Sequence, residues 1–147
     1  MGHEDEPAEQ ADDLALLVSG GDRDDVYTAM GRLRARGALV APALRRIAGE
    51  LTVAAGGRSR AIDTLARLTP VEPDTTRLLM ALLADDESVL VRWTAATALG
   101  TIGDRLAMPV LAQAASADEG RLEVSPGFDV SVRQTAASAL ARLEKSK

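Results

Sequence analysis

The clearest pattern of apolar and polar positions along the chain lies between residues 86 and 104. Apolar side chains recur there at the spacing of one face of an α-helix, at Val91, Ala95, Ala98, Leu99 and Ile102. The two alanines are small enough for a neighbouring backbone to approach closely, whereas the leucine and isoleucine fill volume. Gly103 then ends the helix. The stretch therefore predicts a buried packing helix.

The same spacing recurs in the last predicted helix, which is expected to begin at Asp129, and this match reveals an internal repeat. Leucine and alanine each occupy four equivalent positions, which are Leu33, Leu65, Leu99 and Leu140, and Ala29, Ala61, Ala95 and Ala136. The leucines follow one another at a nearly constant spacing, except for a longer interval before the last. Since single helix pairs bury two faces only by stacking, we expect an all-α, right-handed superhelix (a solenoid) of about four pairs. The predicted pairs are about 11–37, 38–70, 71–103 and 104–145.

Two segments fall outside this helical pattern. Residues 1–10 are acidic and polar, so we expect a flexible lead-in, with the first helix beginning at Asp12 and a single repeat domain over 11–145. The longer interval between the last two aligned leucines is explained by a long connection from Asp118 to Phe128, with a turn at Pro126 and Gly127. A connection of this length in a compact repeat is either functional or mobile.

Residues 91–104, VRWTAATALGTIGD, resemble the second helix of a HEAT-like repeat of the phycobilisome-lyase type, and VRQTAASALARL at 132–143 shares the Val-Arg and Ala-Leu elements. The resemblance implies an armadillo-type superhelix in which the arginine bonds to an acid of an adjacent repeat. That structural role would fall to Arg92 and Arg133, and also to Arg58. HEAT-like repeats are chiefly protein-binding scaffolds, and minorities act as bilin-attachment subunits or alkylated-base glycosylases.

The composition offers few groups for catalysis. The chain of 147 residues has no cysteine and a single histidine, His3, so it has no thiolate metal site, and we expect a cytoplasmic protein. No stretch approaches the roughly 20 apolar residues of a membrane span. The sequence also lacks a glycine-rich phosphate loop, a nucleophile elbow and a histidine dyad. We therefore expect no enzymatic activity, no cofactor, no metal and no membrane association.

The few aromatic residues include two at equivalent repeat positions. Tyr27 and Trp93 are separated along the chain by the same interval as Leu33 and Leu99. Trp93 lies about 200° around its helix from Val91, at roughly 100° per residue, and so points away from the apolar stripe. Because the second helices of a solenoid line its concave side, we expect a partner-binding row. Its members are Tyr27, Ser59, Trp93 and Gln134. The alternative is that Trp93 fills a gap between repeats.

Charge is unevenly distributed along the chain. Residues 22–67 hold nine arginines against five acids, although the whole chain has a formal net charge of −5. The candidate basic patch consists of Arg32, Arg36, Arg45, Arg46, Arg58 and Arg60. Such a patch binds an acidic partner, is covered by the acidic lead-in, or is simply solvated. The net negative charge argues against nucleic acid as a partner, because binding to the phosphate backbone depends on a basic excess.

These observations favour a non-catalytic scaffold or adaptor that binds a protein or peptide. One alternative is an accessory subunit of a bilin-type lyase, although such a subunit needs an acidic or aromatic cleft and the chain is poor in aromatic residues. A further alternative is a shortened HEAT-like DNA glycosylase, for which Trp93, Asp63 and Asp86 are the available side chains.

Overall fold

A computed structural model describes residues 2–145 of the chain, with side chains described from residue 7 onward. Over these residues the fold is all-α apart from one short hairpin, in agreement with the predicted class. The chain divides into two compact units, Met1–Pro70 and Val71–Lys147, which are called unit 1 and unit 2 below. Each unit contains two helix pairs.

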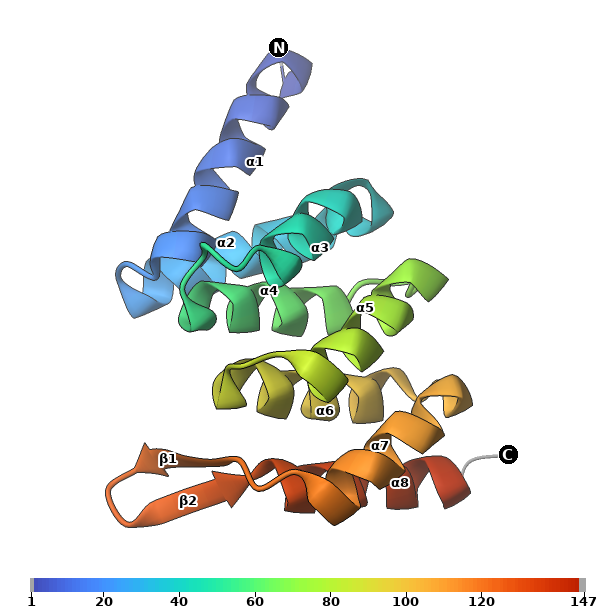
Figure 1. Cartoon of the computed structure of the whole chain (residues 1–147). Helices are drawn as coiled ribbons and strands as arrows, with labels where there is room; N and C mark the ends of the chain where they lie inside the picture. The colour runs from blue at the N-terminus through green and yellow to red at the C-terminus, as the bar shows by residue number, and fades with distance from the viewer. Residues whose placement is uncertain (1, 146–147) are drawn as a thin grey trace. The chain divides into compact units, whose positions relative to one another are not determined.

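Unit 1 holds the first two pairs (Figure 1). Its elements are α1 (Gly2–Ser19), α2 (Arg23–Ala35), the 3-10 helix η1 (Gly37–Val40), α3 (Ala41–Gly49) and α4 (Ala55–Ala66). α1 packs against α2, and α3 packs against α4, as the repeat predicts. Both α1 and α2 also pack against α4, and these contacts join the two pairs into one unit.

The start of α1 differs from the expected position. The helix begins at Gly2 rather than near Asp12. Alanine, glutamate and glutamine are strong helix formers, and acidic side chains near a helix N-terminus interact favourably with the helix dipole. Residues 2–10 are rich in these types, which explains the longer helix. The flexibility expected for residues 1–10 stays a prediction.

Unit 2 holds the other two pairs and the hairpin. Its elements are α5 (Pro73–Asp85), α6 (Val89–Ile102), the 3-10 helix η2 (Arg105–Ala107), α7 (Met108–Ala117), β1 (Arg121–Ser125), β2 (Phe128–Ser131) and α8 (Val132–Lys145). α5 packs against α6 and α7 against α8. Between the pairs, α5 contacts α7 and α6 contacts α8, so first helix stacks on first and second on second.

α6 is the helix predicted from the apolar stripe. Ser88 caps its start, where the side-chain hydroxyl accepts a hydrogen bond from the backbone N–H of Val91 at 3.3 Å. Gly103 ends it in the left-handed conformation, with φ of 78°. Val91, Ala95 and Leu99 are fully buried at 0% exposure, which confirms the stripe as the packing face.

The repeat positions form the core of both units. The four alanines aligned by the repeat are all 0% exposed, and they are Ala29, Ala61, Ala95 and Ala136. Three of the four aligned leucines are likewise buried, whereas Leu140 on the last helix is half-buried. Among the described residues no helix follows α8, so Leu140 has fewer packing neighbours than the other three leucines.

The connection from Asp118 to Phe128 is an antiparallel hairpin rather than an irregular loop. β1 pairs with β2, with Leu122 opposite Val130 and a bulge between Glu123 and Ser125. Gly127 takes the turn with φ of 76°. The predicted start of the last helix at Asp129 is therefore wrong, because β2 extends to Ser131 and α8 begins at Val132.

Candidate functional site

The predicted row is divided between the units, and Tyr27 and Ser59 lie in unit 1. Tyr27, on α2, is 59% exposed, and the guanidinium of Arg23 lies 5.5 Å from the centre of its ring. This cation contacts one aromatic side chain that is otherwise open to solvent. Ser59, on the neighbouring helix α4, is half-buried. Tyr27 is the single Phe, Tyr or Trp residue in the sequence of unit 1, and it is available for contact with a partner.

Trp93 and Gln134 are the members of the row in unit 2, and Trp93 has a structural contact. Its indole Nε1 donates a hydrogen bond to the Thr135 hydroxyl at 3.0 Å, which links α6 to α8. The side chain is half-buried. These two observations favour the alternative interpretation, in which Trp93 fills the space between successive repeats.

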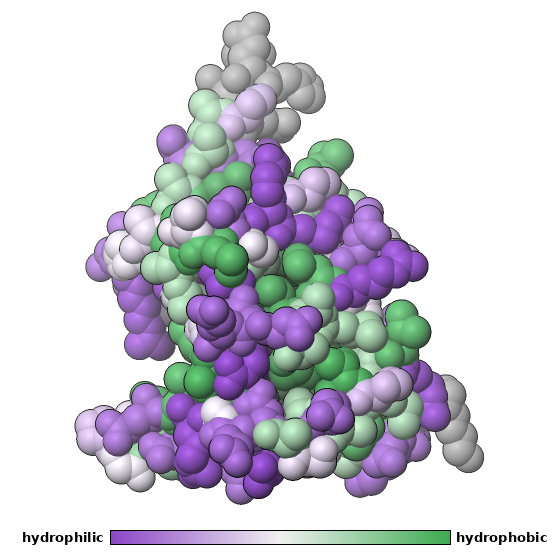
Figure 2. Space-filling view, viewed as in Figure 1, coloured by the Kyte–Doolittle hydropathy of each residue, from purple (hydrophilic) through white to green (hydrophobic). Residues whose placement is uncertain are grey.

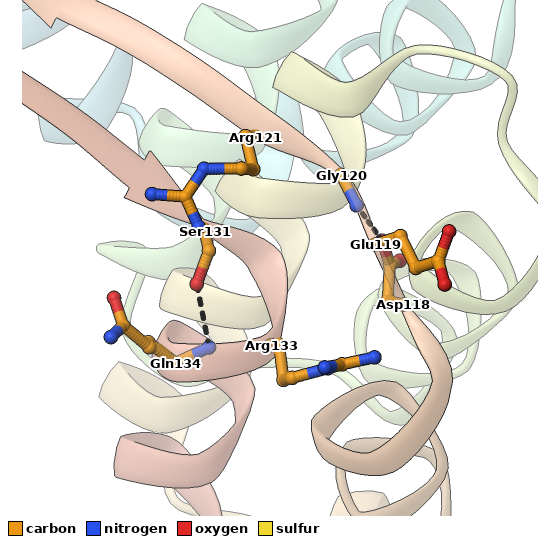
Figure 3. A pocket seen from close by; sticks show the side chains of 7 residues that line it. All are labelled: Asp118, Glu119, Gly120, Arg121, Ser131, Arg133 and Gln134. Atoms are coloured by element: carbon orange, nitrogen blue, oxygen red, sulfur yellow. Dashed lines mark hydrogen bonds between the residues drawn. The ribbon is translucent and has the colours of Figure 1, made fainter.

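Gln134 lies at a pocket that the sequence did not reveal, at the base of the hairpin (Figure 3). The pocket has a volume of about 380 Å³ and is lined by Asp118, Glu119, Gly120, Arg121, Ser131, Arg133 and Gln134. Ser131 caps α8, since its hydroxyl accepts a hydrogen bond from the backbone N–H of Gln134 at 3.0 Å. The lining combines two acids with two arginines, so the pocket has no strong preference for either sign of charge.

Several arginines of the predicted basic patch act inside unit 1 instead. Arg58 is only 4% exposed, and its Nε donates to the backbone carbonyl of Ala48 at 2.9 Å. Arg60 donates to the backbone carbonyls of Leu17 at 2.6 Å and Val18 at 3.2 Å, so it binds the C-terminal end of α1. Placing Arg58 on an exposed patch is therefore wrong, because this arginine is used to satisfy a carbonyl in the core.

Arg32 is also engaged within unit 1, although its side chain is 44% exposed. Its Nη2 donates to Oδ1 of Asp13 at 2.7 Å, and its Nε lies 3.1 Å from each carboxylate oxygen. This hydrogen bonding to Asp13 raises the pKa of Arg32 above its ordinary value. Of the remaining arginines of the patch, Arg36 and Arg45 are half-buried and Arg46 is exposed.

Arg92 joins two successive pairs of unit 2. Its Nε donates to Asp118 Oδ2 at 2.9 Å and its Nη2 donates to Oδ1 at 3.2 Å, a two-pronged contact with an acid at the end of α7. Its Nη1 donates to the backbone carbonyl of Asp86 at 2.9 Å, at the end of α5. Arg133, at the equivalent position of α8, is exposed.

The surroundings of Asp118 determine its ionisation. Burial by itself would raise the pKa of the Asp118 carboxyl. The hydrogen bonds from Arg92 and from the backbone N–H of Gly120, together with the charges of Arg92 and Arg133, outweigh burial, and the pKa is lowered from its ordinary value. Asp118 is therefore a carboxylate at neutral pH, fixed between α6 and the base of the hairpin.

The side chains considered for catalysis have structural partners. Asp63 lies 3.5 Å from Arg67, one turn along α4. Asp86 is 9% exposed, and its carboxylate accepts a hydrogen bond from the backbone N–H of Ser88 at 2.9 Å. Within the part of the chain that the structure describes, there is no cluster of three His, Cys, Asp or Glu side chains suited to a metal ion. Over the same residues, every helix is too short or too polar to cross a bilayer.

The hairpin is the main feature that the sequence interpretation missed. Apolar residues alternate with polar ones in Arg121–Ser125, and again in Phe128–Ser131, on either side of a Pro-Gly turn. This period of two around turn residues is the signal that predicts a hairpin. Val124 and Phe128, near the turn, are 50% and 59% exposed.

Comparison with known protein families gives one match. Residues 55–125 match the family model of HEAT repeats, over a stretch that runs from α4 into β1. No curated protein and no solved structure matches the chain. The match supports a HEAT-like repeat protein, in agreement with the helix pairs of both units.

Proposed function

We propose that the chain is a non-catalytic protein-binding module. HEAT repeats commonly act as scaffolds for other proteins, and arrays of helix pairs present extended surfaces suited to this role. The observation that carries the proposal for this chain is Tyr27, an aromatic side chain that is 59% exposed on the second helix of a repeat. Tyrosine is enriched among the residues that dominate binding energy at protein interfaces.

In this proposal the members of the predicted row have different roles. Tyr27 and Gln134 are exposed and contact the partner, each within its own unit. Trp93 has a structural role in unit 2, because its indole is hydrogen-bonded to Thr135 and holds α6 against α8. Ser59 is half-buried on the neighbouring helix α4, and in this proposal it borders the contact. The partner is a protein or peptide, and the predicted cytoplasmic location fits this role.

The proposal is tested by affinity capture from the source lysate with three baits: the full chain, Tyr27→Ala, and Asp25→Ala as a control. Asp25 is exposed on the same helix, about 160° around it from Tyr27. We expect specific proteins to be captured by the full chain and by Asp25→Ala, and to be lost from Tyr27→Ala. Equal capture by all three baits removes Tyr27 as the site, and no capture by any bait removes the proposed function.

Neither alternative from the sequence gains an observation in its favour. A bilin-lyase subunit needs an aromatic or acidic cleft, and the resemblance to the phycobilisome-lyase type stays a prediction. A base glycosylase needs a free acid beside an aromatic side chain, whereas Asp63 and Asp86 have the structural partners given above.

A further inference from the structure

An apolar groove lies between α1 and α3 in unit 1. It has a volume of about 320 Å³ and is lined by Leu14 of α1, by Ala43, Arg46 and Ile47 of α3, and by Glu50 and Val53 beyond α3. Four of these six residues are apolar. On the face seen in Figure 2, apolar surface of the α1 to α4 region lies among strongly hydrophilic side chains.

In unit 2, the face equivalent to this side of α3 is covered by a helix. η2 and α7 are the counterparts of η1 and α3 in the repeat, so Pro109 aligns with Pro42 and Ala114 with Ile47. In unit 2 the first helices α5 and α7 pack together, and Ala114 is 6% exposed. In unit 1, α1 packs on α2 and α4 instead, and Ile47 remains half-buried at the groove. The face of α3 is therefore suited to one more helix.

Exposed apolar side chains extend this surface at both ends of α3. Leu39, just before the helix, is 86% exposed, and Leu51, just after it, is 78% exposed. α3 has nine residues, so it is about 14 Å long. Exposed apolar side chains gathered near an apolar groove with polar residues at its rim are typical of interaction sites on soluble proteins. The length corresponds to about two and a half turns of a partner helix.

The charges at the rim select the partner. Arg46 and Glu50 are one helical turn apart. Glu50 is engaged by its own turn, since its carboxylate accepts hydrogen bonds from the backbone N–H of Thr52 at 3.3 Å and from the Thr52 hydroxyl at 3.1 Å. Arg46 is exposed, and among the side chains that the structure describes, from residue 7 onward, it has no hydrogen bond or ion pair. The charge left open at the rim is therefore positive.

We propose that this groove binds an amphipathic helix of a partner protein, with a carboxylate beside its apolar face. The apolar face enters between Leu14 and Ile47, and the carboxylate pairs with Arg46. Helices of this type bind through apolar side chains at positions i, i+3 or i+4, and i+7. The surface is separate from Tyr27, so this proposal goes beyond the proposed function and stands without it.

The test is selection of a displayed library of 16-residue helical peptides on the full chain. The library has a fixed leucine face and random polar positions. We expect enriched peptides to carry Asp or Glu beside the leucine face. Arg46→Glu is expected to weaken them at least tenfold in fluorescence anisotropy, because it replaces attraction by repulsion. Ala43→Lys, which places a charged chain in the groove, is expected to abolish binding.

Two control variants separate this result from general effects. Arg34→Glu makes the same change of charge on α2, at an exposed position outside the groove lining, and is expected to leave affinity unchanged. Tyr27→Ala is also expected to bind normally, so failure of the proposed function is distinguishable from failure of this one. Circular dichroism checks that each variant folds.

Three outcomes overturn the proposal. The first is enrichment of peptides without acidic residues, or no enrichment. The second is unchanged affinity in Arg46→Glu. The third is a dimer in sedimentation that Ala43→Lys converts to monomer, because the groove is then an interface between two copies of the chain.

Discussion

Unit 1 and unit 2 are built from the same repeat, but side chains at equivalent positions have different roles in the two units. Tyr27 and Trp93 align in the repeat. Tyr27 is 59% exposed beside Arg23, whereas Trp93 is half-buried and hydrogen-bonded to Thr135 on the next helix. The same place on the repeat thus presents an aromatic side chain to solvent in one unit and joins two helices in the other.

The interiors of the two units differ in the same way. Asp13 is 1% exposed and receives the Arg32 guanidinium, which links α1 to α2. The positions of unit 2 that align with this pair are Leu79 and Ala98, both buried and both apolar. An ion pair in unit 1 therefore stands where unit 2 has hydrophobic packing.

Gly57 shows how neighbouring pairs determine such choices. The aligned residues in unit 2 are Val91 on α6 and Val132 on α8, and both are fully buried. At Gly57 a Cβ atom would lie 2.7 Å from the carbonyl oxygen of Val18 and 3.1 Å from its Cα. The backbone of α1 can therefore approach α4 closely at Gly57, because glycine has no side chain there. The repeat period decides which positions are buried, and the neighbouring helix decides what fills them.

Gly57→Val, which gives unit 1 the residue of unit 2, has the largest expected effect. The side chain would overlap the backbone of α1, and overpacking of this kind costs about 3 kcal/mol. We expect this loss in the free energy of unfolding, measured in urea, together with proteolytic release of α1. An unfolding midpoint equal to that of the native chain would show that α1 moves away from α4 without loss.

Asp13→Ala is expected to have the next largest effect, roughly two thirds of that of Gly57→Val, because it removes the hydrogen bonds from the Arg32 guanidinium to the Asp13 carboxylate and leaves only the more distant Glu9, at 3.6 Å. The double variant Asp13→Leu with Arg32→Ala copies the apolar pair of unit 2. We expect it to recover most of the lost stability in urea. A double variant no more stable than Asp13→Ala would mean that the two units tolerate different interiors.

Asp118→Asn is expected to destabilise unit 2 by about 1–2 kcal/mol at pH 7, through loss of the charged hydrogen bonds to Arg92. Because the pKa of Asp118 is lowered in the folded state, its contribution is present above the unfolded pKa and disappears as pH falls through the folded value. Urea unfolding from pH 7 down to pH 2 should show the native chain converging on the variant. A constant difference across that range contradicts the prediction.

Thr135→Val and Tyr27→Ala test the aligned aromatics and have the smallest expected effects. Thr135→Val removes the acceptor of the indole hydrogen bond and should cost about 1 kcal/mol, with a change in the emission of Trp93, the single tryptophan. Tyr27→Ala should change stability by less than about 0.5 kcal/mol, since the side chain is exposed. Equal losses of stability in the two variants would contradict the different roles of Tyr27 and Trp93.

Features that depend on one helix at a time were predictable from the sequence. The stripe through Val91, Ala95 and Leu99 follows from helical spacing, and these residues are fully buried. The resemblance to HEAT-like repeats implied a bond from Arg92 to an acid of an adjacent repeat, and Arg92 lies 2.9 Å from Asp118. The helix pairs follow from the columns of alanine and leucine.

Features that depend on contacts between helices were not predictable. Arg58 and Arg60 donate hydrogen bonds to backbone carbonyls inside unit 1, whereas Arg46 is exposed. The neighbouring residues in the sequence do not distinguish these two kinds of arginine. Asp13 looks like one more acid of the N-terminal segment until Arg32 is placed beside it. The hairpin did have a local signal, the alternation in Arg121–Ser125, but the strong helical period around it obscured that signal.

The way the hairpin is anchored makes it a place where the chain can change without harm to the fold. Arg92 and the Gly120 backbone hold Asp118 at one end, and the Ser131 cap starts α8 at the other. Lengthening the turn between Ser125 and Phe128 alters neither anchor, and each doubling of a loop adds only about 0.6 kcal/mol of closure entropy. Natural variation in length is therefore expected to concentrate at this turn, where evolution can extend or replace a surface while the stacked helices stay the same.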